Sequence, residues 1–414
     1  MKNQEGLFDG NFQKRQGFFF SRSKRLVQKS HARDPQTQAV PISANLADNL
    51  QRIRETFSDC DDLTILHWQY GPGMEHTAFS VYFGTLIMHK KVNYMKETLQ
   101  DLVTHEVGPG TMITPEDVIA FFGRNIVSAQ SHQLVDDFRD AVEKVTSGCI
   151  VIFFNQWEKA VYYEALDLPS RQVTEPVVKG ARESTLESLE DNLGMIRARL
   201  KSPRFKVKLI TPEGLTKTKV AYGYLEGTVN PEVLAEFERR IGKLKQAEIL
   251  ETSYIEELIE DSTYSPFPQY RFTERPDTAV AALLDGKIIV LVDGTGSILI
   301  CPGLFVELLQ TSEDYYQRTV FSSFIRVMRI VAFLITLTLP SLYIALSTFH
   351  PELIPTTLLL AIVNTRTGTP FPAFIEALIM LFFFELLREA GVRLPRTIGG
   401  AVSIVGALVG GEAA

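Results

Sequence analysis

The sequence predicts an α/β soluble region of two subdomains, followed by an α-helical transmembrane domain. From Ile330 to Leu346 the chain carries no charge, and its residues are apolar or small hydroxyls apart from Pro340 and Tyr343. The residues in front of this run alternate between strand-like and helix-like periods, which is typical of α/β folds. A pattern of helix, glycine and hairpin also occurs twice in that front part, which indicates a duplicated unit.

Five segments follow from these patterns. We assign a basic disordered tail to 1–41, a first α/β subdomain to 42–134, a second α/β subdomain to 135–265, a linker and hairpin unit next to the membrane to 266–326, and an incomplete membrane domain to 327–414. In the tail Lys and Arg outnumber Asp and Glu. It is either a solvated disordered arm or a polybasic arm on anionic lipid, with Phe18–Phe20 inserting into the bilayer.

Composition excludes several classes of function. The formal net charge of −7 does not indicate a nucleic-acid partner. Cys60, Cys149 and Cys301 lie far apart and none belongs to a CxxC motif, so neither a disulfide framework nor a zinc site is expected. We also expect no secretory signal peptide, because Phe18–Phe20 is short and has basic residues on both sides.

The first subdomain is predicted from its periodicity and its turn residues. We expect a helix over 47–57, strands over 63–69 and 78–88, and a helix over 91–102. Thr114-Pro115-Glu116-Asp117 has a capping hydroxyl, a proline and two acids, which is typical of a helix start.

The duplicated unit begins near Val135. A helix ends at Gly148 and is followed by strands over 150–154 and 160–165. The same order recurs, with a helix that ends at Gly286, a strand over 288–292, the turn 293–296 and a strand over 297–301. Between the copies, Ser184 and Glu187 predict a capping box for a leucine-rich helix. Strands over 205–211 and 218–225 and a helix from Asn230-Pro231 complete the second subdomain.

The membrane domain rests on two apolar runs. Ile330–Leu346 is long enough to cross a bilayer, whose hydrocarbon needs roughly 17 to 25 helical residues. Phe371–Leu387 is of similar length but carries Glu376 and Glu385, which are costly in lipid unless they face protein or water. The shorter 353–363 run predicts an interfacial or re-entrant piece. Buried helices of a soluble protein are the alternative, which the lack of a polar face and of caps disfavours.

The arginines around the two runs predict the orientation. Arg318, Arg326 and Arg329 precede the first run, and Arg388, Arg393 and Arg396 follow the second. Because cytoplasmic flanks are enriched in Lys and Arg, both groups are expected on the cytoplasmic side, together with the large N-terminal region.

No residues suggest catalysis, cofactor binding or metal binding. Gly294-Thr295-Gly296 lacks the lysine and hydroxyl of a phosphate loop, so we interpret it as a hairpin turn. The histidines show no ligand spacing, and no nucleophile with an acid-base partner is visible. We therefore expect that the protein is not an enzyme.

Two sets of candidate functional residues remain. The first set would line a pore or form a gate, and it comprises Asn364, Thr365, Thr367 and Glu376. For Glu376 the alternative role is a buried hydrogen bond between helices. The second would couple the lobes to the membrane or form an interface, with a rigid spacer as the alternative for its proline-rich part. It comprises Pro266, Phe267, Pro268, Glu274, Arg275, Asp293, Tyr315 and Tyr316.

Several ordered motifs resemble one known family. Residues 178–183, Val-Lys-Gly-Ala-Arg-Glu, resemble the "VRGPRE" motif of the A subunit of GerA-type nutrient receptors of bacterial spore germination. The resemblance extends over further motifs at 254–259, 265–269, 273–277, 291–295, 312–316, 386–391 and 403–406, and runs from about residue 47 to the end. Lys179, Ala181 and Gly296 depart from the family pattern. Family members continue past the point that matches Ala414, so the chain looks truncated.

This resemblance implies a receptor subunit in the spore inner membrane, with several spans. It implies partnership with a transporter-like B subunit and a lipoprotein C subunit, and a homo-oligomer, a pentamer, that conducts ions when a nutrient is sensed. The polar turn 364–369 and Glu376 are residues that such a pore could use. A non-conducting scaffold whose cytoplasmic lobes recruit partner subunits is the alternative.

Overall fold

The computed structural model describes residues 40–70, 76–87, 133–167, 171–172, 183–262, 264–265, 267–311, 314, 316–366 and 371–393. The chain divides into two compact units, one of Met1–Val177 with Ala181–Gly303 and one of Val178–Gly180 with Leu304–Ala414. The predictions for 1–39, 91–102 and 114–117 lie outside the described residues, as does the motif at 403–406.

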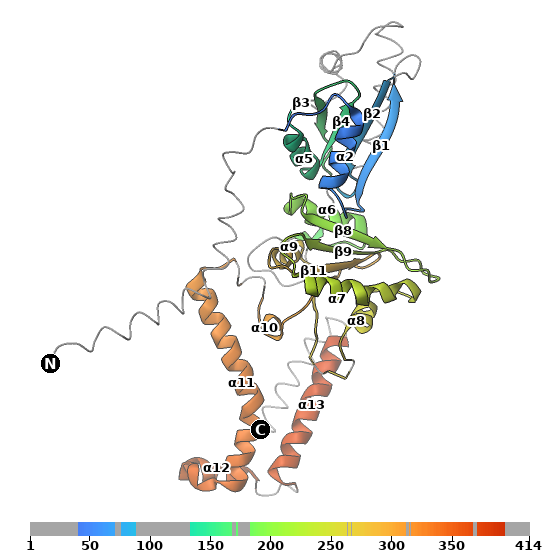
Figure 1. Ribbon diagram of the computed structural model, residues 1–414. Helices are drawn as coiled ribbons and strands as arrows, with labels where there is room; N and C mark the ends of the chain where they lie inside the picture. Colours follow the sequence, from blue (N-terminus) through green and yellow to red (C-terminus); the bar gives the residue numbers. More distant parts are fainter. Residues whose placement is uncertain are drawn as a thin grey trace, which may run out of the picture. The chain divides into compact units, whose positions relative to one another are not determined.

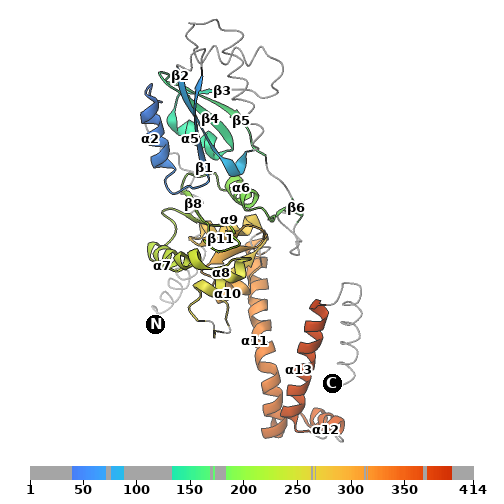
Figure 2. The same ribbon diagram turned by 90° about the vertical axis from the view of Figure 1, so that its right-hand side faces the viewer.

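The first unit contains two five-stranded sheets (Figures 1 and 2). The first sheet has the order β1-β2-β4-β5-β3 and is antiparallel throughout. Its strands are β1 (Leu63–Tyr70), β2 (His76–Phe83), β3 (Gln133–Val135), β4 (Cys149–Phe154) and β5 (Ala160–Glu164). The 3-10 turn η1 (Gly84–Leu86) follows β2, and α2 (Leu46–Thr56) and α5 (Phe138–Thr146) pack on the sheet.

Aromatic side chains fill the core of this lobe. The rings of Phe79 and Phe153 stack at 5.0 Å on neighbouring strands, and Phe57 meets Phe83 edge to face at 5.5 Å. All six residues of β4 are buried, which explains why its sequence is a continuous apolar run. Such rings contribute large buried areas, so they account for much of the stability of the lobe.

The second sheet is also antiparallel and has the order β10-β12-β11-β9-β8. Its strands are β8 (Phe205–Ile210), β9 (Val220–Leu225), β10 (Arg271–Thr273), β11 (Ile288–Val292) and β12 (Ile298–Cys301). One face packs on α6 (Leu189–Arg199) and α9 (Pro276–Leu284). The other packs on α7 (Pro231–Ile241), which continues as η2 (Gly242–Gln246), and on α8 (Thr252–Ile259).

The two lobes repeat one topology. In each, a helix precedes two strands, an insertion follows, and a short edge strand leads through a helix into the central hairpin. The sheet orders correspond strand by strand, β1-β2-β4-β5-β3 with β8-β9-β11-β12-β10. Gly148 and Gly286 end the equivalent helices α5 and α9 with φ values of +85° and +82°, a backbone region that favours glycine. The duplication is therefore larger than the helix-glycine-hairpin unit predicted from the sequence.

Strand pairing moves the predicted boundaries. We expected a second subdomain over 135–265, but β4 pairs with β2 and so belongs to the first lobe. The hairpin assigned to 266–326 pairs with β9, which makes it the centre of the second sheet. Local sequence could not show either pairing, because both join segments about 70 residues apart. The predicted capping box is also corrected: α6 begins after Ser188, whose Oγ accepts the N–H of Asp191.

A buried polar seam joins the two lobes. Main-chain bonds from Asp61 N to Val207 O (2.9 Å) and from Val207 N to Asp59 O (3.1 Å) add the 59–61 loop to the edge of β8. Asp62 and Arg197 form a bidentate ion pair whose side chains are each only 2% exposed. The Arg197 guanidinium also lies 3.8 Å from the ring centroid of Phe83 and 4.9 Å from that of Phe205, so the buried cation is well compensated.

The second unit consists of helices. It begins with α10 (Phe305–Leu308) and α11 (Thr319–Phe349), followed by η4 (Pro351–Leu353), α12 (Thr356–Arg366) and α13 (Ala373–Arg393). Among the described residues, α11 is the one helix whose length and apolar composition suit a membrane span, and its most apolar stretch has no buried residue. Water solvates such a surface poorly, whereas lipid covers it without cost.

Candidate functional site

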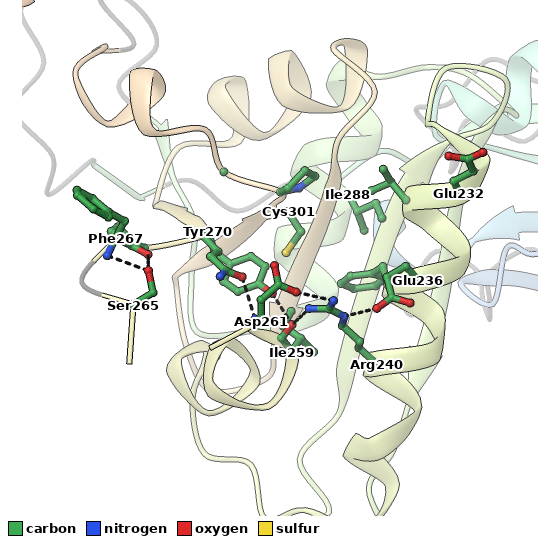
Figure 3. Close-up of a pocket in the computed structure, with 16 residues that line it drawn as sticks. Glu232, Glu236, Arg240, Ile259, Asp261, Ser265, Phe267, Tyr270, Ile288 and Cys301 are labelled. Atoms are coloured by element: carbon green, nitrogen blue, oxygen red, sulfur yellow. Dashed lines mark hydrogen bonds and ion pairs between the residues drawn. The ribbon is translucent and has the colours of Figure 1, made fainter. Parts of the chain in front are cut away.

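A groove lies on the α7 side of the second lobe (Figure 3). Its volume is about 560 Å³. Phe237, Tyr270, Ile288 and Cys301 give it a buried, mostly apolar floor, and residues of α7 and of the 259–270 segment form its walls. The predicted coupling residues Phe267 and Pro268 lie on its rim; Pro266 lies outside the described residues.

Arg240 connects the two walls of this groove. Its Nε donates to Glu236 at 2.6 Å, its NH1 to the carbonyl of Ile259 at 2.7 Å, and its NH2 pairs with Asp261 at 2.5 Å. Hydrogen bonds from Arg239 and Arg240 lower the pKa of Glu236 to about 2, so this carboxylate is ionised at neutral pH. Tyr270 donates to the same Ile259 carbonyl at 2.7 Å. These bonds hold Ile259, Asp261 and Tyr270 beside α7.

The other coupling candidates in this lobe hold the fold together. Arg275 is fully buried and pairs with Asp277 at 2.8 Å. The carbonyl of Glu274 accepts the N–H of Thr185 at 2.9 Å. Asp293 Oδ1 accepts the N–H of Leu189 at 3.1 Å and thereby caps α6. The following Gly294 has a φ of +89° in the turn between β11 and β12, as the hairpin interpretation predicts.

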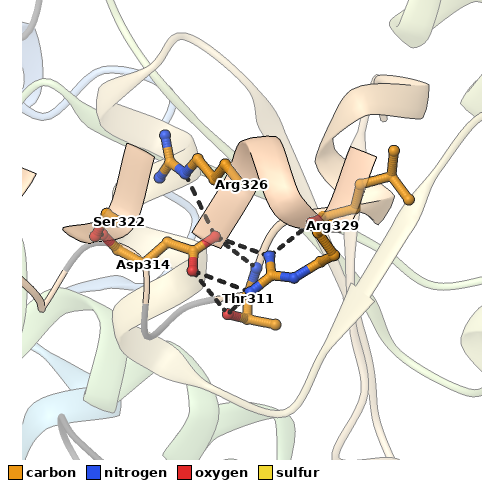
Figure 4. A network of polar contacts seen from close by, with 6 residues as sticks. Thr311, Asp314, Ser322, Arg326 and Arg329 are labelled. Carbon is orange, nitrogen blue, oxygen red and sulfur yellow. Dashed lines mark hydrogen bonds and ion pairs between the residues drawn. The ribbon is translucent and has the colours of Figure 1, made fainter. Parts of the chain in front are cut away.

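A cluster of charges lies at the start of α11, within the second unit (Figure 4). The Asp314 side chain is 4% exposed, and its Oδ2 accepts from Arg329 at 3.0 Å and from Arg326 at 3.4 Å. Thr311 donates to Asp314 from both its backbone N–H and its hydroxyl. Ser322 Oγ donates to the Asp314 carbonyl at 2.5 Å. Thr311 and Asp314 are therefore tied to three positions on the first turns of α11.

Opposing effects set the pKa of Asp314. Burial alone raises it, but the hydrogen bonds from Arg329 and Thr311 and the charges of Arg329 and Arg326 outweigh burial. The net pKa lies below the usual aspartate value, so Asp314 is an anion at neutral pH and neutralises part of the arginine charge on the first turns of α11.

The pore candidates lie around the connection between α12 and α13. Asn364 is exposed near the end of α12, and Glu376 is half-buried in the first turn of α13, where its N–H donates to Pro372 at 3.1 Å. The side chain of Thr365 and the whole of Thr367 lie outside the described residues. Helices α11 and α13 contact each other within this unit. Of the two tyrosines among the coupling or interface candidates, Tyr316 is 45% exposed and Tyr315 lies outside the described residues.

Comparison with known proteins identifies the family to which this chain belongs. The family model described as Bacillus/Clostridium GerA spore germination protein matches residues 51–414. The chain belongs to the GerA family.

Individual relatives of this GerA-family chain agree with that assignment. It is 38% identical to the uncharacterized membrane protein YfkQ of Bacillus subtilis, over 91% of this chain and 72% of YfkQ. It is 37% identical to spore germination protein KA of the same species, over 91% of this chain and 68% of that protein. The predicted resemblance to A subunits of germinant receptors is thereby confirmed.

A solved structure supports the fold of the front part. The N-terminal domain of the A subunit of the Bacillus megaterium spore germinant receptor GerK3 is similar with a TM-score of 0.50 and 27% identity. The likeness covers 65% of this chain and 99% of that domain. The lobes therefore have the fold of a germinant receptor N-terminal domain, built from two antiparallel sheets.

Sequence reasoning missed the cluster at Asp314. We used Arg326 and Arg329 only to predict the orientation of the first apolar run, and we named Tyr315 and Tyr316, but not Asp314, as coupling or interface candidates. A signal was available in the sequence. The predicted span carries two arginines three residues apart on its first turns, and an acid precedes it closely. Arginines near lipid need a counterion, and this acid could supply it. The seam pair Asp62 and Arg197 gave no comparable signal, since 135 residues separate them.

Proposed function

We propose that this GerA-family chain is the A-type subunit of a nutrient receptor in the spore inner membrane, and that its copies oligomerise, as a pentamer, into a nutrient-gated ion channel. The observation that carries the proposal is the family match over residues 51–414, which includes both the lobes and the apolar helices. A transporter-like B subunit and a lipoprotein C subunit would complete the receptor, and the lobes would lie on the cytoplasmic side.

Features of the second unit support a conducting role. Helix α12 has 11 residues, too few to cross a bilayer, and it ends at Arg366, within the polar 364–369 segment. A broken helix at membrane depth is stable only beside protein or water. Copies of α11, α12 and α13 arranged around an axis would give these polar groups such an environment.

Ion release from spores tests the proposal. We would express the natural full-length protein, with its partner subunits, in spores that lack other germinant receptors, and measure potassium release after addition of a nutrient mixture. Thr365→Val and Glu376→Gln are expected to slow release severalfold at unchanged receptor level. Glu352→Gln, a change at an exposed carboxylate in the short 3-10 turn η4 between α11 and α12, is the control.

Crosslinking separates the channel from the scaffold. Crosslinks between copies of this subunit, together with slower ion release in the two variants, would support conduction through it. Normal ion release in both variants and monomers alone after crosslinking would contradict the channel and favour a non-conducting scaffold.

A further inference from the structure

The groove beside α7 has the dimensions of a small-molecule site. Pockets that bind such ligands enclose roughly 300–1,000 Å³ and combine an apolar lining with a few polar groups. This groove, at about 560 Å³, has Phe237, Tyr270 and Ile288 in its floor and Val233 in its wall. It lies within the second lobe, and none of its lining residues belongs to the seam formed by Asp62 and Arg197.

The charges that line the groove are mostly negative. Glu232, Glu236 and Asp261 contribute carboxylates, and Arg240 contributes the cation. The guanidinium of Arg240 is already bonded to Glu236, Asp261 and the Ile259 carbonyl. A ligand anion would therefore meet repulsion from three carboxylates and would have to displace an existing ion pair, whereas a ligand cation would meet attraction.

Glu232 is the carboxylate available to such a cation. It lies in the first turn of α7, one turn before Glu236, so both face the same side of the helix. It is exposed, and in the part of the chain that the structure describes its carboxylate makes no hydrogen bond or ion pair. Glu236 and Asp261, by contrast, are bonded to Arg240.

We propose that this groove binds a small apolar molecule that carries one protonated amine and no carboxylate. The amine pairs with Glu232, and the apolar body lies on Phe237, Ile288 and Tyr270. A zwitterionic amino acid fits less well, because its carboxylate would lie among the three acids of the lining. This inference goes beyond the proposed channel and does not depend on it.

Three matched probes test the ligand class: butylammonium, butyrate and butanol. Saturation-transfer NMR measures the binding of each probe to the full chain in detergent. Butylammonium is expected to saturate, with at least tenfold tighter binding than butyrate or butanol. Equal binding of butyrate, or no saturation by butylammonium, would overturn the proposal.

Variants test the location. Glu232→Gln is expected to weaken butylammonium binding about tenfold, and Val233→Trp, which fills the groove, to abolish it. Glu257→Gln changes an exposed acid on the neighbouring helix α8 that does not line the groove, so it is the control and should bind normally. Unchanged binding by Glu232→Gln would exclude this site. Ion release from spores is measured separately, so the two proposals can fail independently.

Discussion

At the scale of single residues, the chain tolerates a substitution of a charged side chain only where it leaves no buried charge without its partner. Asp62 and Arg197 are each 2% exposed and hold the two lobes together through their ion pair. Arg199 and Glu183 form a second pair close by at 2.5 Å, but their side chains are 31% and 52% exposed. Water screens the second pair and is excluded from the first, so the loss of one partner costs far more in the first pair.

Removing one partner of the buried pair should be costly. Asp62→Asn leaves the Arg197 cation buried without its counterion, which lowers the free energy of unfolding by about 3–5 kcal/mol. Glu183→Gln is the matched control, with an expected change of at most about 1 kcal/mol. Denaturant unfolding of the lobes, followed by tryptophan fluorescence, measures both; similar losses in the two variants would contradict the role given to the seam.

Glycines with positive φ give a second comparison. A Cβ added at Gly286 would lie 2.7 Å from the backbone carbonyl of Thr228, whereas one at Gly294 would meet nothing within 4 Å. Both positions carry the conformational cost of roughly 1–2 kcal/mol for a non-glycine residue. Gly286→Ala is therefore expected to destabilise more than Gly294→Ala, measured as the difference in thermal midpoint. Equal midpoints would show that the Thr228 segment relaxes freely.

At the scale of elements, the Asp314 cluster ties Thr311 and Asp314 to the apolar helix α11. Arg326 and Arg329 are one turn apart on α11, so both reach Asp314 from the same face. Thr311 and Ser322 complete the contacts. Any displacement of the segment before α11 must either move the helix or break this cluster.

The pH dependence of this attachment follows from the lowered pKa of Asp314. Because the folded pKa lies below the unfolded value of about 3.9, the stabilisation is fully present above that value and is lost as the pH falls through the folded pKa. Hydrogen exchange at the first turns of α11 should therefore rise in acid, after correction for the intrinsic rate. In Asp314→Asn, exchange should be raised already at pH 7 and lack this acid step. A wild-type profile in that variant would refute the attachment.

At the scale of the whole molecule, the chain combines a duplicated pair of sheets with a helical unit whose surface suits lipid. Leu334, Leu337 and Leu339 on α11 are 51%, 64% and 57% exposed. The lobes instead have three clusters of buried apolar residues. The contrast between the two units is what the proposed membrane receptor requires.

Insertion of α11 can be tested by charge. An arginine at the centre of a spanning helix costs roughly 2.5–3.5 kcal/mol. Leu334→Arg combined with Leu337→Arg is expected to shift the protein from the carbonate-resistant membrane fraction to the soluble or degraded fraction. Leu215→Arg, at an exposed position in the lobes, should leave the fraction unchanged. Retention of the double variant in the membrane would show that α11 does not span it.

The sequence by itself determined the elements and the family. Periodicity located α2, β1, β4, β8 and α11, Asn230-Pro231 predicted the start of α7, and ordered motifs indicated the GerA family. These features depend on neighbours within a few residues or on direct likeness. The tertiary structure decided which strands share a sheet, that each lobe repeats the other, and that Asp62 reaches Arg197 and Asp314 reaches Arg329. Such pairings depend on long-range packing, because burial brings distant charges together in an order that local patterns do not encode.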